Sequence, residues 1–114
     1  SLFIDPETKQ VEAAAKIGAD IVELHTGAYA QYATGSRTRG EALAKLKAAA
    51  TLAHNLGLEA HAGHGLNYEN VGDIAAIPEL VELNIGHFII GEAVFTGLDI
   101  AILEMRRLMN EART

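Results

Sequence analysis

Apolar residues follow two rhythms that alternate along the chain. Short apolar runs bounded by turn-forming residues predict buried strands, and between them apolar residues recur every three or four positions, as in amphipathic helices. A strand followed by a helix occurs four times, which favours parallel pairing and right-handed crossovers. The expected strands are residues 2–4, 20–25, 58–63 and 81–86, and the expected helices are residues 5–17, 41–56, 68–77, 87–95 and 98–112.

Proline, glycine and small polar residues mark the ends of these helices. Asp5 is expected to cap the first helix, with Pro6 at its first position. Gly18 and Gly57 are expected to follow helix ends, and Pro78 stops the helix that precedes it. In the last helix the residues expected to face the core are Ile102, Met105, Leu108 and Met109.

Residues 26–40 are expected to form a loop, because they are rich in glycine, alanine, serine, threonine and tyrosine. A loop of about fifteen residues inside a compact domain is commonly functional or disordered. Arg37 and Arg39 fall in this segment. They are either solvated loop residues or part of a lid that meets a phosphate group, and the sequence leaves both alternatives open.

Polar residues recur on one face of three of the expected strands. A flat sheet covered by helices on both sides would be nearly apolar throughout, whereas the interior of a barrel brings polar groups from different strands together. The short helix at residues 87–95 also fits, because TIM barrels often bind phosphate with a short extra helix near the last strands. The recurring polar residues are Glu23, His25, Glu59, His61, Glu82 and Asn84.

These features favour an α/β fold of the TIM (β/α)8 barrel class, in which the chain supplies four βα units, strands 5–8, plus the short extra helix. The chain opens on a strand with no lead-in, so we expect it to begin inside a larger protein. Residues 1–114 are then the C-terminal half of a single barrel domain.

Composition narrows the classes of function. The chain has 114 residues, 49% of them hydrophobic, and a net charge of −6, with no basic patch of the kind that binds nucleic acid. The absence of cysteine excludes disulfides and thiol catalysis and fits a reducing compartment. No apolar run reaches the roughly 18 residues that a membrane helix needs. We therefore expect a cytoplasmic protein with no nucleic-acid or membrane partner.

Two Gly-His turns follow successive strands. His64 lies between Gly63 and Gly65, and Gly86 precedes His87 where the extra helix is expected to begin. Glycine allows the backbone to approach a ligand closely, and the free amides at a helix start favour an anion. The two turns predict one shared site for a phosphorylated small molecule.

Four segments, taken in order, resemble one enzyme family along the whole chain. They match the C-terminal half of the pyridoxine 5′-phosphate synthase family, which folds as a (β/α)8 barrel. The resemblance implies condensation of 1-deoxy-D-xylulose 5-phosphate with 3-amino-2-oxopropyl phosphate, with inorganic phosphate and water as further products. It also implies a homo-octamer and no organic cofactor. The segments are Leu2-Phe3-Ile4-Asp5, Glu23-Leu24-His25-Thr26-Gly27, Ala62-Gly63-His64-Gly65-Leu66-Asn67-Tyr68 and Glu82-Leu83-Asn84-Ile85-Gly86-His87.

The same resemblance implies roles for individual residues. His64 matches the proton donor of the family, and Glu23 matches a glutamate that stabilises the transition state. Gly65, Gly86 and His87 match contacts to the phosphate of the amino ketone. One position departs from the family pattern, because asparagine is usual where this chain has His61.

Other interpretations of the same residues remain open. Glu23 requires a partner if it is buried, and His25 or His61 is the expected one. The histidines could also converge with Glu23 on a zinc ion, as in a metal-dependent aldolase or isomerase, although only His61 and His64 have a short ligand spacing. His54 is expected to be a surface or packing residue. A further alternative is a non-catalytic, phosphate-binding half-barrel that pairs with a second copy of itself.

Overall fold

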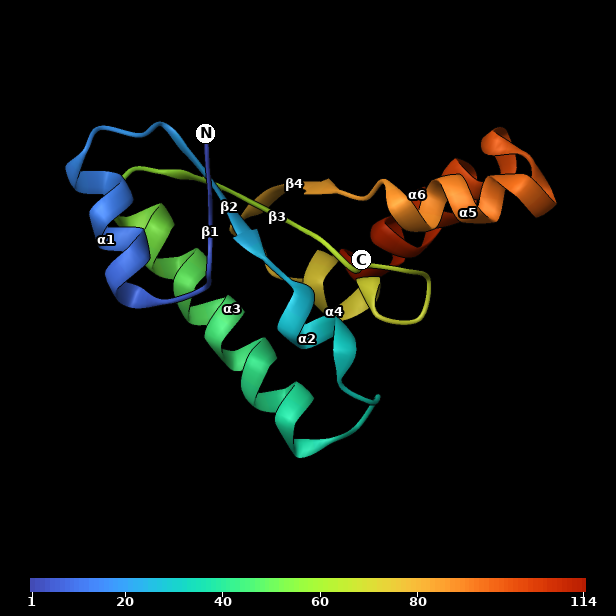
Figure 1. Cartoon of the computed structure of the whole chain (residues 1–114), viewed down its shortest axis with the longest axis horizontal. Coiled ribbons are helices and arrows are strands. Elements are labelled where there is room, and N and C mark those ends of the chain that lie inside the picture. Colours follow the sequence, from blue (N-terminus) through green and yellow to red (C-terminus); the bar gives the residue numbers. More distant parts are fainter.

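The computed structural model describes residues 1–114 and contains one parallel sheet with the strand order β1-β2-β3-β4 (Figure 1). Strands and helices alternate as expected, so the α/β class is confirmed. The strands are β1 (Leu2–Ile4), β2 (Ile21–His25), β3 (Glu59–Gly63) and β4 (Leu80–Asn84). The helices are α1 (Thr8–Lys16), α2 (Gly27–Gln31), α3 (Arg37–Asn55), α4 (Val71–Ala75), α5 (His87–Thr96) and α6 (Leu98–Ala112).

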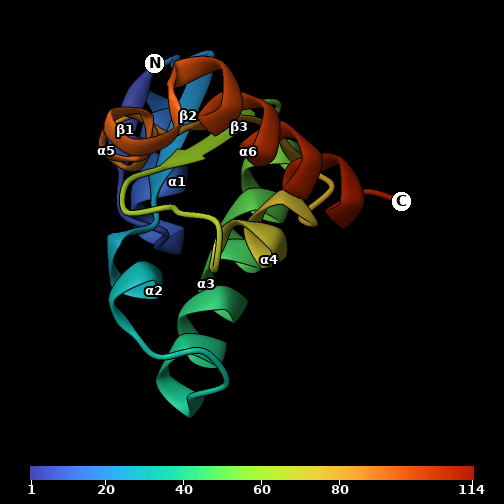
Figure 2. The ribbon, with the colours of Figure 1, turned by 90° about the vertical axis from the view of Figure 1, so that its right-hand side faces the viewer.

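The sheet is wound in one direction only. Helices α1, α3 and α4 lie against the same face of the sheet, while the opposite face is left open (Figures 1 and 2). On that open face Phe3 remains 55% exposed and Glu82 is also exposed. A doubly wound sheet would reverse its strand order and carry helices on both faces. This architecture is consistent with half of a TIM barrel.

The main core lies between the sheet and the helices beneath it. Val22 and Leu24 of β2 are fully buried, and the alternation between apolar and polar residues on this strand is therefore as predicted. Alanines line much of the facing surface of α3, and their small side chains allow the helix to lie close to the strands. The α3 side of the core consists of Leu46, Ala49, Ala50 and Ala53.

The pairing of β3 with β4 contains a register shift. Ala60 pairs with Leu80, but the next residue of β3, His61, pairs with Glu82. Val81 is thus an extra residue in β4 and is 63% exposed. After the shift the pairing is regular again through Asn84.

Several boundaries differ from those expected. The first helix begins at Thr8 with Glu7 as N-cap, so the prediction that Asp5 caps it is wrong. The amide N–H of Asp5 instead donates to the side-chain oxygen of Gln10 at 2.8 Å. A residue in the first turn of α1 therefore accepts a hydrogen bond from the backbone that precedes the helix. The expected ends at Gly18 and Gly57 agree with the structure, since α1 and α3 stop just before them.

The segment of residues 26–40 is not one long loop. It contains the five-residue helix α2, and α3 already begins at Arg37. The Ser36 hydroxyl accepts a hydrogen bond from the Arg39 amide at 3.2 Å, which is a standard helix cap. Because glycine and threonine are frequent in this segment, the composition favoured a loop and the start of α3 was not predicted. Only Thr26 and residues 32–36 lie outside the helices.

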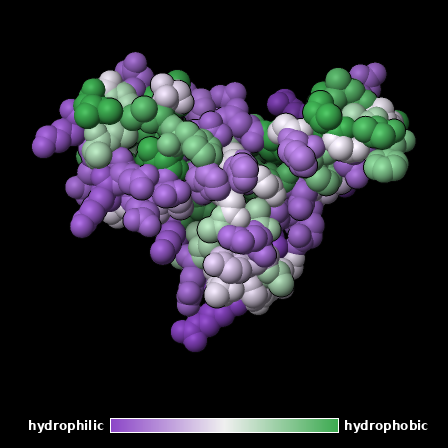
Figure 3. Space-filling view, viewed as in Figure 1, coloured by the Kyte–Doolittle hydropathy of each residue, from purple (hydrophilic) through white to green (hydrophobic).

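Helices α5 and α6 form an arm that extends away from the main core. Met105 is buried against α4 and α5, but Ile102 is 44% exposed, so its predicted inward orientation is wrong. The buried stripe of α6 is set by Ala101 and Met105, and Ile102 lies beside it. Apolar side chains gather at the far end of the arm (Figure 3). None of the helices combines the length and the apolar character that a membrane-spanning helix requires. The exposed apolar residues of this α5–α6 arm are Ile90, Val94, Phe95, Leu98, Ile100, Ile102 and Leu103.

One arginine fastens the end of the arm to the main core. The Arg113 guanidinium donates hydrogen bonds to the backbone carbonyls of Ala75, Ile77 and Leu80, in the connection between α4 and β4. These carbonyls lie at the end of the short helix α4, in the turn that follows it and at the first residue of β4. Arg113 therefore couples the last turn of α6 to the start of β4.

Replacement of Arg113 by alanine is expected to lower the free energy of unfolding by about 1–2 kcal/mol, because the carbonyls lose a charged donor. Urea denaturation measures the change. Arg106→Ala is the matched control, since Arg106 is an exposed residue of α6 whose side chain makes no hydrogen bond or ion pair. Equal effects of the two substitutions would contradict the proposed coupling.

Candidate active site

A cavity of ≈ 630 Å³ opens at the carboxyl ends of the strands, on the open face of the sheet. In parallel α/β folds this edge is where ligands bind, because the loops that follow the strands converge there. The two Gly-His turns meet in this cavity. All five residues singled out for the site line it: Glu23, His64, Gly65, Gly86 and His87.

The sheet register explains how Glu23 enters the cavity. His25 and Asn84 both pair with Gly63, so the end of β3 lies between polar residues of its two neighbours. A Cβ atom at Gly63 would lie 2.6 Å from the Glu23 carboxylate and 2.7 Å from the Asn84 carbonyl oxygen. Only glycine leaves room for the carboxylate to lie across the strand.

His64 adopts a strained backbone conformation, with φ at +94°, which is unusual for a residue other than glycine. Conformations of this kind cost about 1–3 kcal/mol and persist where surrounding contacts enforce them. The Thr26 hydroxyl donates to the His64 carbonyl at 2.6 Å, and the Thr26 amide donates to the Gly63 carbonyl at 2.9 Å. Thr26 is fully buried and was not anticipated from the sequence. It fixes the turn that presents the His64 imidazole.

Gly65 is also shaped by close packing. Its φ is +79°, and a Cβ atom there would lie 2.8 Å from the Cβ of Ala30 in α2. Helix α2 thus presses directly on the turn. The consequence is a backbone surface at Gly65 that is open to a ligand on the cavity side.

The second turn combines Gly86 with the start of α5. Gly86 is the N-cap residue, and no side chain caps the helix. The first amides of a helix have no partner within it, and together with the helix dipole they favour an anion. The imidazole of His87 lies at the same helix start, and Phe88 completes this wall of the cavity.

Glu23 has no hydrogen-bond or ion-pair partner within the protein, so the expected pairing with His25 or His61 is wrong. His61 instead lies between two other carboxylates, Glu59 at 2.8 Å and Glu82 at 3.0 Å. Glu23 is only half buried and faces the cavity, so water or a ligand satisfies it. Its carboxylate is available to a bound molecule.

The histidines do not gather into a metal centre. No group of three or more histidine, aspartate or glutamate side chains in residues 1–114 has a metal-binding arrangement. His61 is engaged by its two glutamates, and His54 is an exposed residue of α3, as expected. The arrangement of the histidines and Glu23 therefore gives no support to the zinc alternative.

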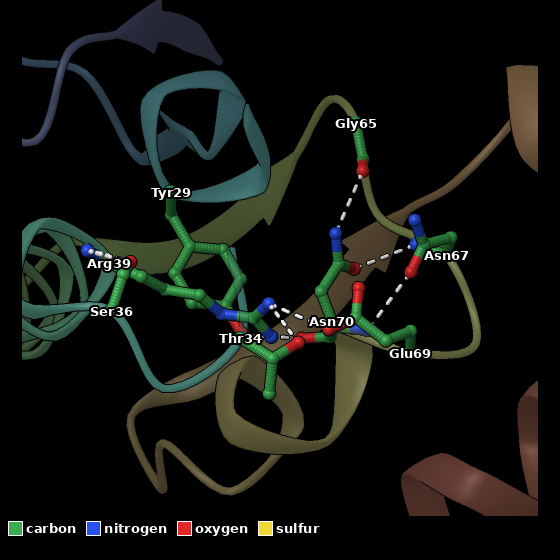
Figure 4. A network of polar contacts seen from close by, with 8 residues as sticks. All are labelled: Tyr29, Thr34, Ser36, Arg39, Gly65, Asn67, Glu69 and Asn70. Atoms are coloured by element: carbon green, nitrogen blue, oxygen red, sulfur yellow. Dashed lines mark hydrogen bonds and ion pairs between the residues drawn. The ribbon is translucent and has the colours of Figure 1, made fainter. Parts of the chain in front are cut away.

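Arg39 belongs to a buried network behind the His64 turn (Figure 4). Its side chain is 7% exposed and donates to Glu69 at 2.8 Å, to Thr34 at 3.0 Å and to the Tyr29 hydroxyl at 3.0 Å. Burial alone would lower the pKa of Arg39, but its hydrogen bonds to Glu69 and Tyr29 raise it overall. The guanidinium stays charged, and neither the solvated-loop nor the lid interpretation holds for it.

The network reaches the cavity through Asn70. The Tyr29 hydroxyl, whose pKa is raised by burial, donates to the Asn70 carbonyl at 2.7 Å. The Asn70 side chain donates to the Gly65 carbonyl at 3.1 Å and accepts from the Asn67 amide at 2.8 Å. A continuous chain of hydrogen bonds thus joins α3 to the turn that carries His64. Arg37, by contrast, is exposed and pairs only with Glu41.

Some residues of the cavity were not predicted. Phe3, Asn67, Asn84 and Phe88 line it but were not assigned roles. Asn84 had a usable signal, because it alternates with Glu82 on the polar face of its strand. Phe3 had none, since an apolar residue in a buried strand is ordinarily part of a core.

The fold and the cavity define an α/β protein with an open cavity at the carboxyl edge of a singly wound parallel sheet. Residues 1–111 match the family described as "Pyridoxal phosphate biosynthesis protein PdxJ", and the chain belongs to this family. It is 59% identical over 115 residues to the pyridoxine 5′-phosphate synthase of Roseobacter denitrificans. It is 58% identical to the enzymes of the same name from Ruegeria pomeroyi and Caulobacter vibrioides. These alignments cover 99% of this chain but only 45–46% of each relative, so the chain spans about half their length.

Replacement of Arg39 by methionine is expected to lower the free energy of unfolding by about 2–3 kcal/mol, because Glu69 and the buried Tyr29 hydroxyl lose their charged partner. Chemical denaturation measures this loss. Arg37→Met is the control on the same helical turn, with an expected change below about 0.5 kcal/mol, since its ion pair is exposed. A loss in Arg39→Met no larger than in the control would show that the network contributes little.

Proposed function

We propose that this chain is the C-terminal half of a pyridoxine 5′-phosphate synthase and supplies strands 5–8 of its (β/α)8 barrel, as one part of a single domain. The relatives carry that name, and their length of about 250 residues is the usual size of a TIM barrel. The singly wound sheet supports the same assignment. Strands β1 and β4 each have one unpaired edge, where strands of the other half would add.

The proposed reaction condenses 1-deoxy-D-xylulose 5-phosphate with 3-amino-2-oxopropyl phosphate and yields pyridoxine 5′-phosphate, inorganic phosphate and water. No cofactor is needed for these steps. The protein acts in the cytoplasm as a homo-octamer, as the family resemblance implies. Both substrates are phosphorylated, so the site must bind a phosphoryl group and transfer protons beside it.

The observation that carries this proposal is the convergence of the two Gly-His turns with Glu23 in one cavity. Gly65 and the Gly86–His87 helix start are suited to hold the phosphate of the amino ketone, because their amides and the helix dipole favour an anion. The imidazole of His64 is exposed on the same cavity wall and serves as proton donor.

Glu23 has a different role in the proposed mechanism. Imine formation and the following dehydrations place positive charge on the substrate nitrogen. A carboxylate without a protein partner stabilises that charge as it develops, and it does so only when substrate is bound. His64 and Glu23 thus act on proton transfer and on charge, respectively.

Replacement of His64 by alanine in the full-length protein is expected to lower kcat by about 10²–10⁴-fold, the usual contribution of a positioned acid or base. Pyridoxine 5′-phosphate formation and phosphate release provide the measurement, and circular dichroism verifies the fold. His54→Ala, on the exposed face of α3, is the control and is expected to turn over normally. Normal turnover by His64→Ala would refute the assigned role.

A second candidate function is a phosphate-binding half-barrel without catalysis, which pairs with a second copy. It is favoured by the two open strand edges and by the exposed apolar residues of the α5–α6 arm, of which Phe95 is 86% exposed. Surfaces of this kind need a partner, whether the other half of the barrel or another copy of the chain.

Sedimentation separates these two candidates. On the first, the 114-residue chain alone self-associates without a defined size and has no turnover, and a separately expressed N-terminal half converts it into an active complex. On the second, the chain alone forms a discrete dimer that binds inorganic phosphate. An active monomer of the chain alone would contradict both.

A further inference from the structure

The imidazole of His25 packs against that of His64. The two ring centroids lie 4.6 Å apart with an interplanar angle of 29°, which is a stacked arrangement. His25 also packs against Phe3 in an edge-to-face arrangement, with the ring centroids 4.9 Å apart and an interplanar angle of 64°. His25 is half buried at the end of β2; it does not line the 630 Å³ cavity but lines a neighbouring cavity of ≈ 370 Å³ beside α2 and α3. It therefore contacts His64 from outside the cavity that His64 lines.

The orientation of the His25 ring is fixed by the backbone. The amide N–H of Gly27 donates to Nδ1 of His25 at 3.0 Å. Because Nδ1 accepts this hydrogen bond, the ring is neutral and carries its proton on Nε2. The ring that faces His64 is thus a flat, uncharged surface held in one tautomer.

Gly27 leaves space for this pair of rings. A Cβ atom at this position would lie 2.3 Å from Cε1 of His25 and 3.1 Å from Cδ2 of His64. The first distance is shorter than any real contact, and both rings would have to move. The absence of a side chain at Gly27 is therefore a condition for the stack.

The ring of His64 has no other support of this kind. Within residues 1–114 the ring makes no hydrogen bond or ion pair, and the hydrogen bonds from Thr26 and Asn70 act on the backbone of the turn rather than on the imidazole. An exposed side chain without polar contacts would sample several rotamers. The stack on His25 is the contact that selects one of them.

We propose that His25 is a positioning residue that holds the imidazole of His64 in its productive orientation over the cavity. It does so by stacking as a neutral ring, and it lies outside the 630 Å³ cavity that contains Glu23 and the two Gly-His turns. This inference rests on the proposed function, in which His64 is the proton donor. Aromatic pairs of this geometry contribute enough to change a rotamer population about five- to tenfold.

The test uses the full-length protein with His25→Ala and His25→Phe. His25→Ala is expected to lower kcat about five- to tenfold with KM changed less than twofold, because substrate binding does not involve this ring. His25→Phe keeps a flat ring beside His64 but loses the Nδ1 acceptor of the Gly27 amide, so its kcat is expected to lie between those of the alanine variant and the wild type. Unchanged kcat in the alanine variant, or equal loss in both variants, would overturn the proposal.

A readout that needs no turnover separates this inference from the proposed function. In the wild type, the ring protons of His64 carry a ring-current shift from His25, and its χ1 couplings report one rotamer. His25→Ala is expected to abolish that shift and to average the couplings, while His25→Phe, which keeps a ring beside His64, is expected to retain part of the shift and less averaging than the alanine variant. If the wild type has no synthase activity, the proposed function fails, and the NMR result alone then decides the role of His25. A His64 ring that stays in one rotamer in His25→Ala would overturn that role.

Discussion

The parallel register of β2, β3 and β4 is the constraint from which the rest of the site follows. It brings the carboxyl ends of three strands to one edge, where His25 and Asn84 both lie beside Gly63. Everything that follows these strands, including the turn at His64 and the helix start at Gly86, is thereby confined to one small region. Helices on both faces of the sheet would have closed this region. Because helices cover only one face, the cavity on the other face is open.

Two kinds of support act on the His64 turn, and they differ in chemistry. Thr26 and Asn70 hold its backbone through hydrogen bonds to carbonyl oxygens. Close packing acts on the same turn from α2, where Ala30 leaves space only for a glycine at position 65. Hydrogen bonds fix direction and packing fixes distance, so the turn is held in a conformation that its sequence alone would disfavour.

The sequence predicted those features that depend on local pattern. Alternation in residues 21–25 placed Val22 and Leu24 in the core, and the glycines around His64 marked a turn that lines the cavity. It failed where a distant contact decides the outcome. Nothing near Arg39 in the chain indicates that its side chain will be buried and bonded to Glu69 and Tyr29. Likewise, Glu23 was expected to pair with His25 or His61, but His61 pairs with Glu59 and Glu82 instead. Ser36, the N-cap of α3, was a local signal for a helix start, but the polar residues around it favoured a loop, so the helix was expected to begin only at residue 41.

The extra residue in β4 has a consequence for which side chains face the cavity. Counting strictly by twos from the buried Leu80 would direct Glu82 and Asn84 toward the helices and Leu83 toward the ligand. The shift at Val81 reverses this parity, so that the amide rather than the leucine enters the cavity. The polarity of this wall therefore depends on the extra residue at Val81, which allows Leu80 to face the core while Glu82 and Asn84 face the same side of the sheet as Glu23.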